Sequence, residues 1–110
     1  LGGGSRHLTS PNRRVRDIAK YSISSPKTCR LLLKLVDYFA PDTVLELGTC
    51  LGISTLYMAS ALKRGAKIVS VEGSKSLVQI ARENLAPIAD RVELMQGDIQ
   101  QVLPKIIERY

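Results

Sequence analysis

The sequence predicts an α/β domain built on a parallel sheet, in which a strand–helix unit occurs three times. Short apolar runs alternate with segments whose apolar residues recur every three or four positions, as strands and amphipathic helices do. A turn that contains glycine follows each apolar run. This alternation favours a parallel sheet with right-handed crossovers. With 110 residues, the chain is one small domain or part of one.

The composition excludes several classes of protein. The chain is 45% hydrophobic and 24% charged, which is ordinary for a soluble globular protein. No apolar run approaches the ~20 residues that span a bilayer, so no membrane association is expected. Residues 1–10 lack the apolar centre of a signal peptide. Cys29 and Cys50 are too few for a disulfide framework and lack metal-ligand spacing, which favours a reducing cytoplasm and predicts no metal site.

The first part of the chain, residues 1–41, is expected to be a basic helical leader or cap. The chain has a net charge of +6, and residues 1–40 account for the whole excess. The basic side chains there are Arg6, Arg13, Arg14, Arg16, Lys20, Lys27, Arg30 and Lys34, against Asp17 and Asp37. Such an excess fits either a solvated helical face or attraction to an anionic partner such as nucleic acid. No interleaved aromatic residues support base stacking, so the solvated face is preferred and nucleic-acid binding is not expected.

Two helices are predicted in this leader. The first begins at the capping residue Asn12, with Val15, Ile18, Ala19 and Ser22 at helical spacing. The second begins at Ser24-Ser25-Pro26, because a serine cap followed by proline is typical of a helix start. Its predicted apolar face consists of Leu31, Leu32, Leu35, Val36 and Phe39, and Pro41-Asp42 ends the helix.

The three strand–helix units follow. Residues 43–47 are predicted to be a buried strand, and a helix from Ile53 to Leu62 ends before Gly65. Residues 67–71 form the second predicted strand, and Ser74 caps the next helix. The buried stripe of that helix is predicted to be Leu77, Ile80, Ala81, Asn84 and Leu85. Residues 91–95 alternate like a third strand, and the last helix is expected to begin near Leu103 because Pro104 suits a first turn.

An acidic residue lies at the end of each predicted strand, namely Glu46, Glu72 and Asp98. The carboxyl ends of parallel strands share one edge of the sheet, where open α/β sheets bind ligands. Taken singly, each carboxylate could be a helix cap or a solvated turn residue. Together with the glycine-containing loop after the first strand, they favour a ligand site.

The loop after the first strand does not match the common nucleotide motifs. A dinucleotide fingerprint starting at Gly48 would need glycine at Cys50 and Ile53, and the phosphate-loop pattern also fails. Instead, the stretch Glu46-Leu47-Gly48-Thr49-Cys50-Leu51-Gly52-Ile53-Ser54-Thr55 resembles the first motif of class I S-adenosylmethionine-dependent methyltransferases. Within that class it is most similar to the small-molecule O-methyltransferases of the catechol and caffeoyl-CoA type. The resemblance extends over residues 22–110.

The resemblance implies a Rossmann-like fold and a set of cofactor contacts. The backbone around Gly48, Thr49 and Gly52 would pack against the methionine end of S-adenosylmethionine, with Glu46 holding that end and Ser54 bonding its carboxylate. Glu72 would accept hydrogen bonds from both ribose hydroxyls. The remaining implied contacts are Gly73 and Ser74 in the same pocket, and Gly97, Asp98 and Ile99 at the adenine.

A complete domain of this family has seven strands in the order 3-2-1-4-5-7-6, and this chain is expected to supply strands 3-2-1. Residues 42–110 are therefore predicted to be the cofactor-binding half of a truncated domain, inactive alone, with the catalytic base and any metal ligands elsewhere. The strand at 43–47 would be an open, aggregation-prone edge, paired either by a missing C-terminal half or by a second copy. The predicted reaction is O-methylation of a small-molecule acceptor. The alternatives are a non-catalytic module that binds nucleic acid or a partner protein through its leader, and a nucleotide-dependent oxidoreductase.

Overall fold

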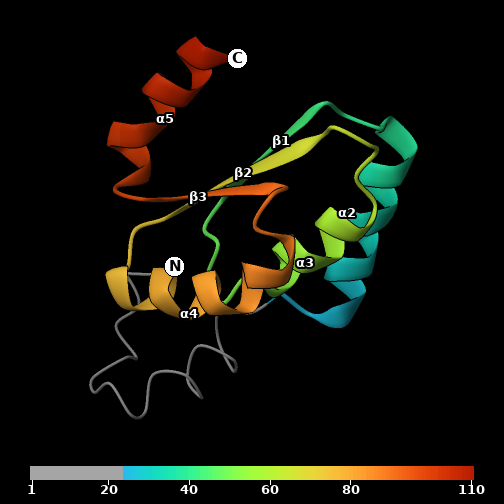
Figure 1. Ribbon diagram of the computed structural model, residues 1–110, viewed down its shortest axis with the longest axis horizontal. Helices are drawn as coiled ribbons and strands as arrows, with labels where there is room; N and C mark the ends of the chain where they lie inside the picture. Colours follow the sequence, from blue (N-terminus) through green and yellow to red (C-terminus); the bar gives the residue numbers. More distant parts are fainter. Residues whose placement is uncertain (1–23) are drawn as a thin grey trace.

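The computed structural model describes residues 24–110, which form an open α/β sandwich (Figure 1). The helix predicted from Asn12 lies outside the described residues. The elements in chain order are α2 (Pro26–Phe39), β1 (Thr43–Leu47), α3 (Ile53–Ser60), β2 (Lys67–Glu72), α4 (Lys75–Leu85), the 3-10 turn η2 (Ala86–Ile88), β3 (Val92–Gln96) and α5 (Ile99–Arg109). The strands form one parallel sheet in the order β1-β2-β3, which confirms the predicted arrangement.

The helices cover both faces of this sheet (Figure 1). Helices α2, α3 and α4 lie on one face and α5 lies on the other. Alternate residues of β2 serve the two faces, as the pleat requires. Ile68 packs with Val36 of α2 and Met58 of α3, whereas Val69 and Val71 pack with Ile106 of α5. Because both faces of β2 are covered, the strand is buried along nearly its whole length.

The start of α2 is as the sequence predicts, but its apolar face is only partly buried. The Ser25 side chain accepts a hydrogen bond from the Thr28 N–H at 3.1 Å, and Pro26 occupies the first turn. Val36 is buried, whereas Leu31 and Phe39 are 55% and 70% exposed. The predicted apolar face was therefore too broad, because only Val36 and the partly buried Leu32 pack into the core shared with α3 and β2.

Strand β1 has the predicted bounds but not the predicted burial. Leu45 and Leu47 are 39% and 42% exposed. Within the described residues β1 pairs only with β2, so its other side forms the free edge of the sheet. The prediction of a buried strand was therefore wrong, and the expectation of an open edge is confirmed.

The middle helices differ from the prediction in detail. Helix α3 ends at Ser60, two residues before the predicted Leu62. Ser74 caps α4 as predicted and accepts from the Leu77 N–H at 3.4 Å. Val78 lies in the buried stripe of α4 and the exposed Asn84 does not.

The last helix begins earlier than predicted. Asp98 is its N-cap and accepts a hydrogen bond from the Gln100 N–H at 2.9 Å. Pro104 consequently lies inside α5 and not in its first turn. An aspartate cap determines the start here, and the helix tolerates the proline, which removes one N–H donor. No helix among residues 24–110 is both long and apolar enough to cross a bilayer.

Candidate functional site

The loop between β1 and α3 is tightly folded and fixed to the sheet. Gly48, Cys50 and Gly52 all have positive φ angles, at 95°, 55° and 86°. The Gly48 and Thr49 N–H groups donate to the Val71 carbonyl of β2, at 2.8 and 3.2 Å. The alternation of left-handed residues turns the chain from the strand into the helix within five positions, and two of those positions suit glycine.

The C-terminal part of α4 packs against the loop between β1 and α3. The Asn84 side-chain amide donates to the Leu51 carbonyl at 2.9 Å. A Cβ atom at Gly52 would lie 3.1 Å from Leu85 Cγ, which is tighter than ordinary packing. Gly52 is therefore required by its backbone conformation and also by the close approach of α4.

Glu46 is the hydrogen-bond acceptor that joins the loop, the sheet and α3. Its Oε2 accepts from the Ser54 hydroxyl at 2.7 Å, and its Oε1 accepts from the Ser70 hydroxyl at 2.7 Å. Thr55 also donates to Oε1. A carboxylate can only accept, so the single proton of Ser54 is committed to Glu46. Ser54 therefore offers acceptor lone pairs to its surroundings. This arrangement does not support the implied bond from Ser54 to the cofactor's carboxylate, because the hydroxyl has no second proton to donate.

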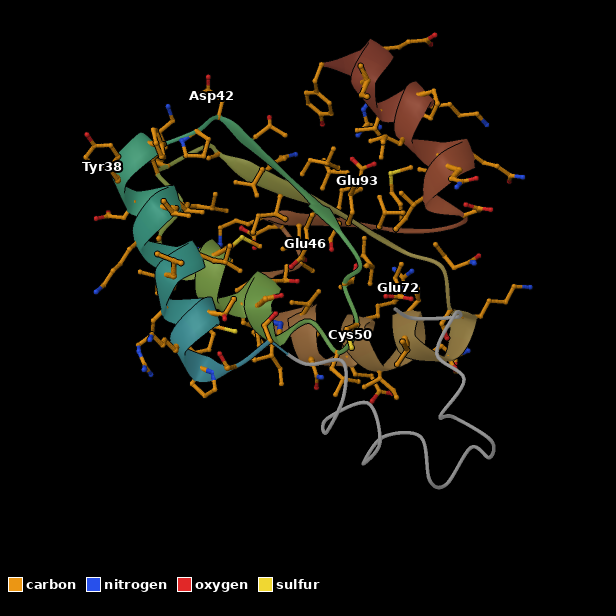
Figure 2. All side chains as sticks on the ribbon, turned by 180° about the vertical axis from the view of Figure 1, so that it is seen from behind. Tyr38, Asp42, Glu46, Cys50, Glu72 and Glu93 are labelled. Carbon is orange, nitrogen blue, oxygen red and sulfur yellow. The ribbon has the colours of Figure 1, made fainter. Side chains whose placement is uncertain are left out.

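Glu72 joins two loops at the end of β2 and is only 1% exposed. Its Oε1 accepts from the Cys50 N–H and its Oε2 from the Ser74 N–H, both at 2.9 Å. Each oxygen thus keeps acceptor capacity for one further donor. Glu46, Cys50 and Glu72 lie near one another, far from Tyr38 and Asp42 at the other end of the sheet (Figure 2).

The loop after β3 adjoins the loop after β2. The Gly97 N–H donates to the Glu72 carbonyl at 3.0 Å, and the Gln96 side-chain amide donates to the Gly73 carbonyl at 3.2 Å. A Cβ atom at Gly97 would lie 2.7 Å from Val102 Cγ2, so this position cannot accept a side chain without movement. Asp98 is exposed and caps α5 through Oδ1, and Ile99 packs against the core formed with α5.

The structure thus brings the three strand-end turns to one edge, as the sequence predicts. A pocket at this edge is lined by Ser24, Gly48, Thr49, Cys50, Leu51, Ile53 and Ser54. The Thr49 hydroxyl is buried and bonds to the Ser70 hydroxyl at 2.5 Å, so only the rest of Thr49 faces the pocket.

Sequence reasoning missed Ser24, Ser70 and Asn84 at this edge. For Ser70, a signal existed, because a hydroxyl between Val69 and Val71 in a buried strand needs a polar partner. Ser24 and Asn84 reach the loop through the tertiary fold, which the sequence pattern does not reveal.

Within the described residues, the charged side chains at the three strand ends are the carboxylates of Glu46, Glu72 and Asp98. Burial is the main cause that raises the pKa of the Cys50 thiol above its ordinary value, and Glu72 and Glu46 add to that rise. The Cys50 thiol is therefore neutral at pH 7. Within residues 24–110 the ion pairs join Lys63 to Asp42 and Arg109 to Glu93, so Glu46 and Glu72 have no basic partner there. Among the residues that the structure describes, two carboxylates without a basic partner favour a ligand that carries positive charge and hydroxyl or N–H donors.

The described residues contain no group of three or more His, Cys, Asp or Glu side chains that could hold a metal ion. The donor set at this edge consists instead of backbone N–H groups, hydroxyls and two carboxylates.

The sequence is similar to known O-methyltransferases. The family model described as "Protein-L-isoaspartate(D-aspartate) O-methyltransferase (PCMT)" matches residues 13–105. The transmembrane O-methyltransferase homolog of Mus musculus is 37% identical over 110 residues, covering 96% of this chain and 43% of that protein. Catechol O-methyltransferase B of Danio rerio is 33% identical over 91 residues, covering 81% of this chain and 34% of that protein.

Solved structures show the same fold. The O-methyltransferase from Bacillus cereus, solved in complex with S-adenosylhomocysteine (SAH), superimposes with a TM-score of 0.77 at 29% identity, covering 92% of this chain and 50% of that one. The O-methyltransferase TomG from Streptomyces achromogenes, solved with S-adenosylmethionine, gives a TM-score of 0.75 at 28% identity, covering 96% and 48%.

The chain spans half or less of the length of each of these proteins. The matched part contains the glycine loop and all three strand-end carboxylates. The chain therefore belongs to the family of S-adenosylmethionine-dependent O-methyltransferases.

Proposed function

We propose that the protein binds S-adenosylmethionine at the edge formed by the three strand ends and serves methyl transfer to an oxygen of a small-molecule acceptor. The observation that carries the proposal is the position of Glu72. Its two carboxylate oxygens each accept one backbone N–H, from Cys50 and Ser74, and each keeps capacity for one more donor.

This arrangement suits a vicinal diol such as the two ribose hydroxyls of the cofactor. The two backbone bonds fix the carboxylate before a ligand arrives, so the Glu72 side chain itself needs little ordering at binding. Since Glu72 is 1% exposed, the surface over its carboxylate must open for a ribose to reach it. Gly73 and Ser74, which follow Glu72, would contact the same ribose.

The methionine end of the cofactor is assigned to the glycine loop. Gly48 and Thr49 line a pocket that Ser54 also lines, and Glu46 holds the loop through Ser54. Gly52 does not line this pocket and would act through the shape of the loop. The N-terminal end of α3 adds a partial positive charge that suits the cofactor's carboxylate.

The adenine is assigned to the third turn. Asp98 uses one carboxylate oxygen to cap α5, and its other oxygen would accept from the exocyclic amine. Gly97 and Ile99 flank Asp98 and would contact the ring.

The cofactor supplies an electrophilic methyl group on a sulfonium. What residues 24–110 contribute is position and charge: Glu72 orients the ribose, the glycine loop holds the methionine end, and two carboxylates complement the cationic ligand. Holding the reacting atoms in line is a large source of rate in such transfers. No residue of this chain is assigned as the catalytic base.

A calorimetric titration tests the proposal. We expect SAH to bind the full-length protein and NAD not to bind, and Glu72→Ala to weaken SAH binding by at least about 100-fold, since a charged acceptor of two hydrogen bonds is lost. Glu93→Ala is a matched control, because Glu93 lies on the neighbouring strand and pairs with Arg109. An unchanged SAH affinity in Glu72→Ala would refute the assignment.

The nature of the acceptor rests on the relatives. Catechol O-methyltransferases among them point to a small phenolic acceptor, and the family description names an isoaspartyl protein. Incubation of the full-length protein with labelled S-adenosylmethionine and either catechol or an isoaspartyl peptide decides between them. We expect methylation of catechol alone.

We also propose that β1 pairs with a further strand, from the same polypeptide or from a second copy. Leu45 and Leu47 are exposed on this edge, and an apolar groove beside it is lined by Thr43, Leu45, Val69, Ile106, Ile107 and Tyr110.

We propose that the protein is located in the cytoplasm, where the free thiols of Cys29 and Cys50 would stay reduced. Cell fractionation with an antibody to this chain tests that assignment.

A further inference from the structure

Ser70 occupies an unusual position for a serine. It lies in the middle of β2, fully buried, between Val69 and Val71. A hydroxyl buried among apolar groups costs free energy unless it is hydrogen-bonded. Here the hydroxyl serves both as a donor and as an acceptor, because Ser70 bonds to Glu46 Oε1 at 2.7 Å and to the Thr49 hydroxyl at 2.5 Å.

The chemistry of the partners fixes the direction of these bonds. The Glu46 carboxylate can only accept, so the single proton of Ser70 goes to Glu46. Thr49 must then donate its own proton to Ser70. The result is a one-way chain of hydrogen bonds from Thr49 through Ser70 to Glu46, which also receives the Ser54 proton.

We infer that Ser70 and Thr49 are positioning residues for the part of the pocket that holds the amino-acid end of the cofactor. The inference rests on the proposed function. Register supports it, because Ser70 is the direct neighbour of Glu46 across the sheet. By fixing the carboxylate, Ser70 keeps the Ser54 proton on Glu46 Oε2. Ser54 therefore presents lone pairs to the pocket, as an ammonium group requires.

Two ligands separate positioning from general stability. SAH carries the amino-acid end, whereas 5′-methylthioadenosine keeps the adenosine and lacks that end. We expect Ser70→Ala in the full-length protein to weaken SAH binding about tenfold, the loss of roughly one hydrogen bond to a charged group. Its affinity for methylthioadenosine should stay within about twofold, since Glu72 and Asp98 are untouched.

Two further variants complete the design. Thr49→Val removes only the first hydroxyl of the chain, keeps the side-chain shape, and should produce the same selective loss in weaker form. Val69→Ala is the matched control, because its side chain lies on the opposite face of β2 against α5. It should lower the free energy of unfolding without separating the two ligands.

The outcomes are distinct. Equal weakening of both ligands by Ser70→Ala, an unchanged SAH affinity in both hydroxyl variants, or the same selectivity in Val69→Ala would overturn the inference while leaving the cofactor site in place. Failure of the wild-type protein to bind SAH at all would instead overturn the proposed function.

Discussion

Gly52 and Gly65 adopt nearly the same backbone conformation, at φ +86° and +83°, but differ in their surroundings. A Cβ atom at Gly52 would meet Leu85 Cγ at 3.1 Å, whereas none would be met within 4 Å at Gly65. We expect Gly65→Ala to lower the free energy of unfolding by about 1–2 kcal/mol, the cost of a left-handed alanine. Gly52→Ala should cost about 1–3 kcal/mol more through overpacking. Urea denaturation measures the free energy of unfolding of both variants. Equal losses would show that Leu85 and α4 can shift to accommodate the added methyl group without cost.

The two cysteines provide a residue-level probe of the pocket. Burial raises the pKa of both thiols. Because the thiolate reacts, alkylation should be slow at pH 7 and should become faster as the pH rises toward the raised pKa. Cys50 lines the pocket and Cys29 does not. At about pH 9, where more thiolate is present, saturating SAH should slow iodoacetamide labelling of Cys50 several-fold and leave Cys29 unchanged, as read by peptide mass spectrometry. Protection of Cys29 alone would place the ligand elsewhere.

The sequence located the strand-end carboxylates but not the groups that hold them. Glu46, Glu72 and Asp98 follow directly from the rule that parallel strands end on one edge. Ser70 gave no periodic signal, because β2 is buried on both faces and does not alternate. Its role depends on its register with Glu46, which only the tertiary structure defines.

At the scale of elements, the start of α5 shows two local rules in competition. Pro104 favours a helix that starts beside it, and Asp98 favours one that starts at Ile99; the structure follows the aspartate. The cap satisfies an N–H that would otherwise lack a partner, and the turns before the proline bury Val102 and Ile99 beside the core. The aspartate cap sets the boundary and packing of the first turns supports it. The sequence offered Asp98 as a possible cap but did not show that this cap would outweigh the proline.

This competition gives a prediction. Asp98→Ala should lower the free energy of unfolding by about 1 kcal/mol through loss of the cap. Pro104→Ala should raise it by about 1 kcal/mol or more, because a backbone donor is restored inside the helix. Chemical denaturation followed by circular dichroism measures both changes. A destabilising Pro104→Ala would mean that the rigid proline ring contributes more through the unfolded state than it costs in the helix.

At the scale of the whole molecule, the order of the sheet was predictable and the burial of its edge was not. The alternation of strands and helices predicts parallel pairing with right-handed crossovers. The strand order came from the family resemblance, and the observed order β1-β2-β3 agrees with it. The apolar composition of β1 suggests burial on both faces, yet burial depends on which neighbours are present. Among residues 24–110 the only neighbour of β1 in the sheet is β2.

The exposed edge leads to the last prediction. The 110-residue chain should associate in a concentration-dependent way, since a free apolar strand is a template for pairing. Leu45→Lys places a charge at this edge and beside the apolar groove, and should reduce association strongly. Leu35→Lys on α2 is the matched control, because Leu35 is 43% exposed, close to the 39% of Leu45, but lies off the edge. Light scattering measures the mass of each variant. A wild-type mass that stays at 12.1 kDa at all concentrations, or an equal effect of the two lysines, would contradict pairing through β1.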